Sequence, residues 1–471
     1  MFVDREDELE SLQNQWESKK SSFIVIYGRR RIGKTSLIKE YIKDKPHVYY
    51  LSTELPIEDQ FNDIQRQAGK ELDIDLLKNE PFDRWEDFFS YISDLDRRFI
   101  LAIDEFPYLI QADKAIPSLF QKGWDEYLKN SKIDLILCGS SISMMEDNVL
   151  KSDSPLYGRK TSQIKLRALP LKSIKIFLPD QNLEDIVRYY SIYGGVPAYL
   201  ELLDPKQTLK QNLENTLLKT DAPLRDSVDF VLKTELRKPE RYRAIPANLA
   251  RGSTTLNELS QDLDLQGNRV SQYLAKLRTL RLVKREEPIT ISPSKKKRRG
   301  HYKITDKFFR FYFHYILPNR SDIEEGNIDI VLDEFKSTES HFISPIFEEI
   351  CRGHVIKKMD YSKVGRWWYK ENEIDIVALN ESKNKILFGE CKWTKNRVDS
   401  KLLNNLKSKS KKVRWRNQDR KEKYSLFSKS GFTDDVKQKA LQSKNLQLIS
   451  LEDILNYSKR HNLLYDLSVF Y

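Results

Sequence analysis

Cysteine and long apolar runs are both scarce in this chain of 471 residues. The three cysteines, Cys138, Cys351 and Cys391, are scattered, odd in number and without CxxC spacing. This pattern supports neither a disulfide framework nor a zinc site, so a reducing cytoplasm fits best. The longest apolar runs, such as FIVIY from residue 23, are far shorter than the ~20 residues of a membrane span. The N-terminus has no basic start followed by an apolar stretch, so we expect a cytoplasmic protein with no secretory signal and no membrane contact.

Acidic residues are outnumbered: 81 Lys and Arg face 70 Asp and Glu, which gives a formal net charge of +11. The excess lies mainly in residues 295–299 and 401–423. Such runs are usually solvated faces or loops, so alone they leave contact with nucleic acid open. The chain is too long for one ordinary core, and its length predicts about three domains.

A glycine-rich motif follows the first apolar run. The letters GRRRIGKT at residues 28–35 fit the pattern G-x-x-x-x-G-K-[ST]. The glycines let backbone N–H groups point inward, and a helix that starts at Lys34 adds its positive end, which builds a phosphate nest. Lys34 can reach the outer phosphates, and the Thr35 hydroxyl can ligate Mg²⁺. The predicted nucleotide-binding residues here are Gly28, Arg29, Arg30, Arg31, Ile32, Gly33, Lys34, Thr35 and Ser36, with the roles of the three arginines left open.

Four later apolar segments predict the rest of a parallel sheet. They cover residues 47–52, 99–104, 133–139 and 162–169, and helical stretches separate them in the βαβ rhythm of an α/β domain. The second of them ends in Asp104, which Glu105 follows. At the carboxyl edge of a sheet, Asp104 can hold Mg²⁺ through water and Glu105 can polarise the attacking water. This pair predicts hydrolysis of the nucleotide.

Two further residues are candidates for contact with the γ-phosphate. Ser140 follows the segment 133–139, where ATPases with an extra strand between the phosphate-loop strand and the acidic strand place a polar sensor. It can equally be a helix N-cap. Arg159 follows the turn SPLYG, and an arginine on the γ-phosphate contributes ~10³–10⁵ in rate. The alternative is a surface arginine, and whether Arg159 acts in its own chain or on another subunit stays open.

Five motifs in this order resemble the archaeal-type ATPase family: FVDREDELESL, YGRRRIGKTSL, LAIDEF, SPLYGR and YGGVPAYL. That family belongs to the STAND branch of AAA+-like ATPases. The resemblance implies ATP with Mg²⁺, and a small helical lid that completes an ATPase domain over residues 1–222. It also implies that the turn Gly195–Pro197 lies near the nucleotide and that residues around Phe2–Arg5 contact adenine.

Residues 223–316 are similar to a winged helix. Thr255 and Glu258 have capping-box spacing, and a second helix over residues 268–282 follows a short turn. Two strands, 282–285 and 301–304, flank a basic loop that contains KKKRR at 295–299. We expect contact with DNA phosphates, although winged helices also serve as protein docking modules. The outward positions of the second helix carry Asn268, Arg269, Gln272, Lys276 and Arg278.

Within the predicted domain 317–471, residues from about Pro345 to Leu455 resemble the restriction-endonuclease-like, or PD-(D/E)XK, nucleases. Asp375 lies in an alternating strand, and a second strand places Glu390 and Lys392 on one face. The carboxylates can hold Mg²⁺ while Lys392 assists the nucleophile or the developing charge. Glu348 matches an acidic helix residue that many members add as a metal ligand. The alternative is a hairpin with a salt-bridged Glu and Lys, and such folds often persist as inactive binding modules.

The fold class predicted for the whole chain is α/β: a P-loop parallel sheet of AAA+-like type with a helical lid, a winged helix-turn-helix and a restriction-endonuclease-like domain. The predicted function is an ATP-regulated, Mg²⁺-dependent DNA-cleaving enzyme in defence or mobile-element biology. One alternative is a nucleotide-switched DNA-binding or scaffolding protein with an inactive nuclease fold. Another is a toxin-like ATPase regulated by a protein partner. The chain could also form homo-oligomers.

Overall fold

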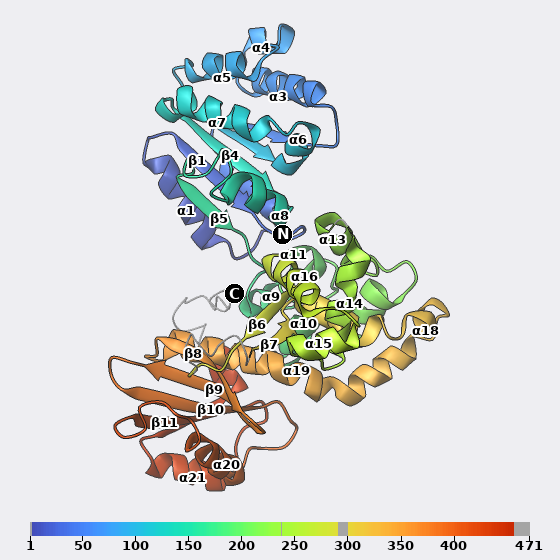
Figure 1. Ribbon diagram of the computed structural model, residues 1–471, viewed down its shortest axis with the longest axis vertical. Coiled ribbons are helices and arrows are strands. Elements are labelled where there is room, and N and C mark those ends of the chain that lie inside the picture. Colours follow the sequence, from blue (N-terminus) through green and yellow to red (C-terminus); the bar gives the residue numbers. More distant parts are fainter. Residues whose placement is uncertain (1, 237, 291–299, 456–471) are drawn as a thin grey trace. The chain divides into compact units, whose positions relative to one another are not determined.

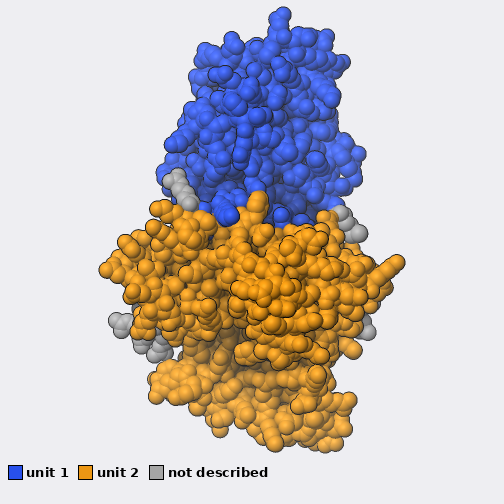
Figure 2. Space-filling view, turned by 90° about the vertical axis from the view of Figure 1, so that its right-hand side faces the viewer, with its two compact units in different colours: residues 1–168, 196–198, 233–237 blue, residues 169–195, 199–232, 238–471 orange. Residues whose placement is uncertain are grey.

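The computed structural model describes residues 2–236, 238–290 and 300–455 (Figure 1). The chain divides into two compact units, which Figure 2 colours separately. Unit 1 comprises residues 1–168, 196–198 and 233–237, and unit 2 comprises residues 169–195, 199–232 and 238–471. The segment 169–195, which belongs to the predicted lid, therefore clusters with the C-terminal half of the chain.

Unit 1 contains a five-stranded parallel sheet in the order β2-β3-β4-β1-β5. The predicted α/β fold with a parallel sheet is confirmed, and β4 lies between the phosphate-loop strand β1 and the acidic strand β3. Because the strands are parallel, the residues that follow β1, β3 and β4 share one edge. The strands are β1 (Ser22–Tyr27), β2 (His47–Leu51), β3 (Phe99–Asp104), β4 (Ile133–Gly139) and β5 (Ser162–Lys165).

Helices cover both faces of this sheet, which explains why its central strands are apolar throughout. Phe23 and Val25 pack on one face with residues of α3, α5 and α7, while Ile24 and Ile26 pack on the other with residues of α1 and α2. The helices of this part are α1 (Glu6–Glu17), α2 (Lys34–Ile42), α3 (Ile57–Glu71), α4 (Asp75–Asn79), α5 (Trp85–Ser93), α6 (Phe106–Ala112), α7 (Ile116–Glu126), η1 (Leu128–Asn130), α8 (Ile142–Met145) and η2 (Glu146–Leu150).

Unit 2 begins with helical segments, and the capping box predicted at Thr255 and Glu258 is confirmed at the start of α15. A two-stranded antiparallel hairpin, β6–β7, follows α16. Aromatic residues follow the hairpin and are buried, as is typical of packing residues: Phe308, Phe309, Phe311, Tyr312 and Phe313. The elements are α9 (Leu171–Phe177), α10 (Leu183–Tyr193), α11 (Pro197–Leu200), α12 (Leu209–Leu213), η3 (Glu214–Leu218), α13 (Ser227–Glu235), α14 (Pro239–Ala250), α15 (Leu256–Asp262), α16 (Gly267–Thr279), β6 (Val283–Glu286), β7 (His301–Ile304), α17 (Lys307–Phe311), η5 (Tyr312–Ile316) and α18 (Arg320–Glu324). The start of α11 and the end of α13 belong to unit 1.

A second five-stranded sheet, in the order β12-β11-β10-β9-β8, forms the C-terminal part of unit 2. The strands β8, β9 and β10 are antiparallel neighbours, whereas β10, β11 and β12 are parallel. Helices α20 and α21 pack on one face of this sheet and the long helix α19 packs on the other (Figure 1). The elements are α19 (Ile328–Lys358), β8 (Lys363–Tyr369), β9 (Asn372–Asn380), β10 (Lys385–Lys392), α20 (Ser400–Ser410), β11 (Lys421–Ser428), α21 (Asp434–Gln442) and β12 (Leu446–Ser450).

Across the described ranges, none of the helices is both long enough and apolar enough to cross a membrane.

Candidate functional site

The phosphate loop connects β1 to α2 at the carboxyl edge of the unit 1 sheet. A side chain at Gly28 would place its Cβ 2.5 Å from the carbonyl oxygen of Leu166, so only glycine fits there. Gly33 is the N-cap of α2 and has φ 90°, in the left-handed region that glycine tolerates. Helix α2 therefore begins directly after a tightly curled loop, and its first N–H groups, which have no partner within the helix, lie at the end of that loop. This cradle fits a bound phosphate.

Lys34, Thr35 and Asp104 meet at this loop. The Lys34 ammonium donates a hydrogen bond to the Arg29 carbonyl oxygen over 3.1 Å, so it folds back into the loop. The Thr35 hydroxyl donates to Asp104 Oδ2 over 2.6 Å. Tyr49, on β2, donates to the same oxygen over 2.9 Å. Burial and the neighbouring Asp104 raise the pKa of Tyr49, which keeps its hydroxyl protonated as a donor. A threonine hydroxyl beside a buried carboxylate is the donor set that shares Mg²⁺ in P-loop proteins.

Glu105 is held by the end of β4. Its own N–H donates to Asp104 Oδ1 over 2.9 Å, and its Oε2 accepts from the Ser140 hydroxyl over 2.7 Å and from the Ser140 N–H over 3.1 Å. Glu105 has φ 54°, an uncommon backbone conformation that turns its side chain toward this edge. The N-cap of α8 is the next residue, Ser141. Ser140 therefore contacts the carboxylate of Glu105 through both its hydroxyl and its N–H.

Arg30 joins the same network, which the sequence did not reveal. Its Nε donates to the Ser140 hydroxyl over 3.2 Å, and its Nη2 donates to the Tyr108 hydroxyl over 2.6 Å. The two neighbouring arginines differ, since Arg31 is exposed and Arg29 supplies the carbonyl that Lys34 contacts. The sequence does not distinguish the three consecutive arginines. The curvature of the loop gives each of them different surroundings.

Two segments that the family resemblance links to the nucleotide lie against the loop. The Arg5 side chain is buried and donates to the carbonyl oxygens of Ile32, over 3.0 Å, and Arg167, over 2.7 Å. Arg5 therefore connects the phosphate loop to the segment that follows β5. A Cβ at Gly33 would lie 3.9 Å from Pro197 Cγ, so the segment 196–198 borders the loop.

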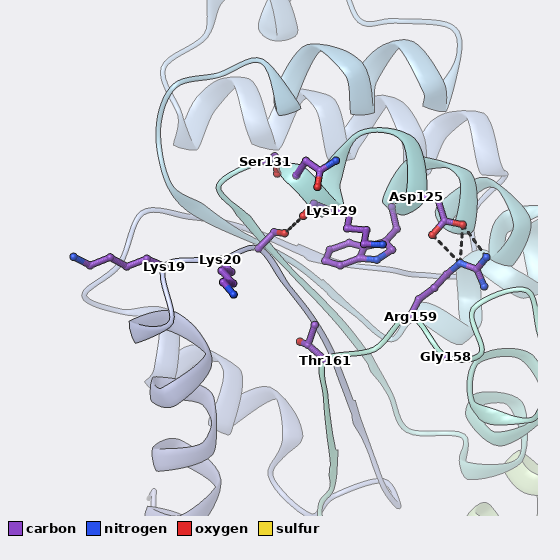
Figure 3. A pocket seen from close by; sticks show the side chains of 11 residues that line it. Lys19, Lys20, Asp125, Lys129, Ser131, Gly158, Arg159 and Thr161 are labelled. Carbon is purple, nitrogen blue, oxygen red and sulfur yellow. Dashed lines mark hydrogen bonds and ion pairs between the residues drawn. The ribbon is translucent and has the colours of Figure 1, made fainter.

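Arg159 lies at the opposite, amino edge of the sheet. It lines a pocket of 560 Å³ together with Ser21 and Thr161, which directly precede β1 and β5 (Figure 3). Its guanidinium pairs with Asp125 over 2.7 Å and donates to the Pro155 carbonyl oxygen over 2.7 Å. Within one chain the structure thus does not bring Arg159 to the phosphate loop. Arg159 could take part in hydrolysis only at the nucleotide of another subunit.

A second cluster lies in unit 2, where β9 and β10 meet. Gly389 pairs with Ile376 in the antiparallel register, which places Asp375 next to Glu390. Asp375 Oδ2 accepts from the Cys391 N–H over 2.9 Å. Burial and the neighbouring Glu390 raise the pKa of Asp375 to about 6. Two carboxylates that repel one another fit a divalent cation, which would neutralise both.

Cations already contact this cluster. Lys409, from α20, lies 2.7 Å from Glu390 Oε1, and Lys392 lies 3.8 Å from Glu390 Oε2. The sequence predicted Lys392, but nothing in it singled out Lys409 among the many lysines around it.

The third predicted carboxylate, Glu348 on α19, is also paired with cations. Its Oε2 lies 3.4 Å from Arg352 Nη1 and 3.5 Å from Arg366 Nε, while burial and Asp375 raise its pKa. No three His, Cys, Asp or Glu side chains among the described residues come together as a metal-holding group. Mg²⁺ commonly takes one or two carboxylates and completes its shell with water, so Asp375 and Glu390 form the core of the candidate site.

Comparison with known proteins shows the family. Residues 2–203 match the family described as "ATPase domain predominantly from Archaea", and residues 312–410 match one described as "Archaea bacterial proteins of unknown function". An uncharacterised protein of Methanocaldococcus jannaschii is 40% identical over 423 residues, which cover 88% of this chain and 92% of that protein. This chain belongs to the archaeal-type P-loop ATPase family.

Two further similarities agree with this membership. An uncharacterised ATP-binding protein of Methanocaldococcus jannaschii is 51% identical over 45 residues, covering 10% of this chain and 76% of that protein. A Walker-type ATPase of Pyrococcus abyssi has a TM-score of 0.52 and 20% identity, covering 66% of this chain and 96% of that chain. At this identity the likeness concerns the fold. As a member of the archaeal-type ATPase family, the chain is expected to use a nucleotide, usually with Mg²⁺.

Arg30 gives a first prediction for this archaeal-type ATPase. Arg30→Ala removes the donor that orients Ser140 toward Glu105, and hydrogen bonds to charged groups contribute enough that ATP turnover should fall about tenfold. ATP affinity, measured by titration calorimetry, should change by less than about threefold because Lys34 and Thr35 are untouched. Arg66→Ala, which removes an exposed arginine from α3, is the control and should keep turnover. Equal losses in both variants would contradict the specific role of Arg30.

Proposed function

We propose that this chain is an ATP-regulated, Mg²⁺-dependent enzyme that binds and cleaves DNA. The observation that carries the proposal is the pair of carboxylates Asp375 and Glu390, which the strand register places next to one another with Lys392 beside Glu390. Its setting supports the assignment. Helix α19, the antiparallel strands β8 to β10, helix α20 and the parallel strand β11 follow one another in the order of restriction-endonuclease-like folds. The net charge of +11 suits a polyanionic substrate.

The residues of this site divide the work of phosphodiester cleavage. Asp375 and Glu390 would hold Mg²⁺, with Asp375 oriented by the Cys391 N–H. Bound Mg²⁺ polarises a phosphoryl oxygen and lowers the pKa of an attacking water. Lys392 is 40% exposed at its side chain, so its ammonium can also face the scissile phosphate. Lys409 neutralises Glu390 while no cation is bound, and would have to move aside when one binds.

Helix α16 and the hairpin β6–β7 are the proposed DNA-binding element, arranged like a winged helix. Asn268, Arg269, Gln272 and Arg278 are exposed on α16, and Lys276 is half-buried. The basic residues 295–299 of the predicted wing lie outside the described residues. Backbone contacts by such cations would make binding salt-sensitive.

Salt dependence tests this element. Arg269→Ala should weaken binding of a 20-base-pair duplex uniformly across sequences and lower the slope of log K against log salt by about 1. Fluorescence anisotropy over a series of salt concentrations measures both quantities. Lys70→Ala, at an exposed position of α3, is a charge-matched control that should leave the slope unchanged. An unchanged slope for Arg269→Ala would remove α16 from the interface.

In the ATPase part, Glu105 is proposed to activate the attacking water, and Ser140 with Arg30 to report the γ-phosphate to Glu105. We further propose that the chain belongs to the STAND branch, with an ATPase domain and its helical lid over residues 1–222, a winged helix over 223–316 and a nuclease-like domain over 317–471. Arg159 could reach a nucleotide only in a homo-oligomer, because it lies at the far edge of its own sheet. A DNA-cleaving ATPase of this kind would fit defence against foreign DNA or the movement of mobile elements.

A second candidate function is a nucleotide-switched DNA-binding protein whose nuclease fold is inactive. The cations on the carboxylates favour it, since Lys409 contacts Glu390 while Arg352 and Arg366 contact Glu348. Duplex, single-stranded and branched DNA, incubated with Mg²⁺ or Mn²⁺ and with or without ATP, separate the two. Cleavage that is lost in Lys392→Ala supports the enzyme. Tight binding without cleavage of any substrate supports the inactive module.

A further inference from the structure

The hairpin β6–β7 is attached to strand β8 of the C-terminal sheet, within unit 2. The N–H of Ile289, just beyond β6, donates to the carbonyl oxygen of Arg366 over 3.0 Å. A Cβ at Gly365 would lie 3.3 Å from the Cβ of Ile289, so the two backbones pass closely. The rings of His301 and Trp368 meet edge to face at 5.0 Å. The hairpin therefore continues along the edge of the sheet that carries Asp375.

Arg366 lies between carboxylates from two different parts of unit 2. Its Nη1 is 3.6 Å from Glu286 Oε2 on the hairpin, and its Nε is 3.5 Å from Glu348 Oε2 on α19. It also pairs with Glu373 at the start of β9. The Arg366 guanidinium thus contacts both the hairpin and the carboxylate of α19. Glu286 and Glu348 compete for its charge.

Further cations surround each of the two acids. Glu286 pairs with Lys303 over 2.6 Å and with Lys284 over 3.3 Å, and these cations hold the pKa of Glu286 well below its ordinary value although burial opposes the shift. On the other side, Arg352 pairs with Glu348 over 3.4 Å and donates to the Asp375 carbonyl oxygen over 3.0 Å. The contacts thus run from the hairpin through Arg366, Glu348 and Arg352 to the backbone of Asp375.

Buried ion networks are costly, because desolvation often exceeds the Coulombic gain and an apolar replacement can be equally stable. Stability alone therefore gives no reason for this one. Its position between a proposed DNA-binding hairpin and a proposed cation site suggests a coupling role.

We propose that Arg366 is a positioning residue through which the hairpin β6–β7 sets the divalent-cation affinity of the site formed by Asp375 and Glu390, acting through the charge of the neighbouring Glu348. The proposal rests on the function proposed above. When Arg366 is drawn toward Glu286, the negative charge of Glu348 is available to a cation. When Arg366 is drawn toward Glu348, it neutralises that charge and the affinity falls. A shift of the hairpin, as on binding DNA, thereby changes the cation site.

Titration of the full chain with Mn²⁺, followed by electron paramagnetic resonance without nucleotide, tests this coupling. Asp375→Asn defines the site by abolishing its share of the binding. Arg366→Gln should tighten Mn²⁺ binding at that site by about fivefold or more, and Glu286→Gln should weaken it by a similar factor. Arg366→Lys keeps the charge and should stay near the wild type. Lys363→Gln, which removes an exposed lysine from the same strand, is the matched control and should have no effect.

Opposite signs for Arg366→Gln and Glu286→Gln are the decisive result, because a merely structural role would weaken Mn²⁺ binding in both. An unchanged thermal unfolding curve, measured by circular dichroism, confirms that unit 2 of each variant is folded, since Glu286, Arg366 and Asp375 lie in that unit. Unchanged affinity in both variants, or weakening in both, overturns the coupling. Mn²⁺ binding that depends on Asp375 without any DNA cleavage would refute the proposed nuclease activity and leave the coupling standing. Absence of Asp375-dependent binding would overturn both.

Discussion

Glu105→Gln is expected to lower ATP turnover by about 10²–10⁴-fold, the contribution typical of a general base. The amide oxygen of the variant can still accept the hydrogen bonds that Ser140 donates to Glu105. It cannot take a proton from water. Lys34 and Thr35, which are proposed to hold the nucleotide, are unaltered, so the affinity for ATP should stay within about threefold. Steady-state hydrolysis and equilibrium binding, measured side by side, separate the two effects.

Glu58→Gln, an exposed carboxylate on α3, is the matched control and should leave turnover unchanged. A Glu105→Gln variant with near-normal turnover would mean that another group activates the water. Because Ser140 and Arg30 are positioned around Glu105, such a result would also remove their proposed roles.

Asp375→Asn is expected to lower Mg²⁺-dependent DNA cleavage by about a hundredfold or more, since the site loses the charge of one of its two central carboxylates. The amide keeps the shape of the side chain and its hydrogen bond from the Cys391 N–H. DNA binding should change little, because the proposed DNA-contacting cations of α16 are unaltered. Nicking of a supercoiled plasmid in Mg²⁺ measures the loss.

Glu371→Gln, at an exposed position between β8 and β9, serves as the control for the loss of one negative charge near the same strands. Cleavage that survives in Asp375→Asn but vanishes in Lys34→Ala would place the activity elsewhere. Such an outcome would favour an inactive nuclease fold.

The parts of the nucleotide site that the sequence predicted are those fixed by local backbone rules. Gly28 is required because the Leu166 carbonyl oxygen lies too close for a side chain, and Gly33 is favoured because its φ is positive. Asp104 ends a strand that can be predicted from its apolar run. The segment 99–104 coincides with β3, whereas the segment 162–169 is longer than β5, which ends at Lys165. After that residue the chain turns so that the Leu166 carbonyl lies over Gly28.

The sequence did not predict those residues of the two sites whose contacts are with residues far away in the chain. Their side chains are of common types that form no recognisable motif. Tyr49 is 55 residues from Asp104, and Arg30 is 110 residues from Ser140. No local periodicity marks such pairs, because they depend on which loop ends share the sheet edge. The same holds for Lys409 and Arg366, which belong to a chain with 81 basic residues.

Arg159 shows the opposite case, since its position could have been inferred. It lies just before the strand that begins at Ser162, and residues that precede a parallel strand occupy the amino edge of the sheet. Phosphate loops occupy the carboxyl edge. The turn motif SPLYGR suggested a role for Arg159 at the nucleotide. The direction of the parallel strands, however, places Arg159 at the edge of the sheet opposite to the phosphate loop of its own chain.

The central claim is that the site formed by Gly28–Thr35, Asp104 and Glu105 binds and hydrolyses ATP. Release of phosphate from ATP by the full chain, with and without Mg²⁺, tests it most directly when wild type is compared with Lys34→Ala. The expected result is turnover that requires Mg²⁺ and is lost in Lys34→Ala, because the ammonium that folds into the loop is gone. Equal turnover by wild type and Lys34→Ala would contradict the claim.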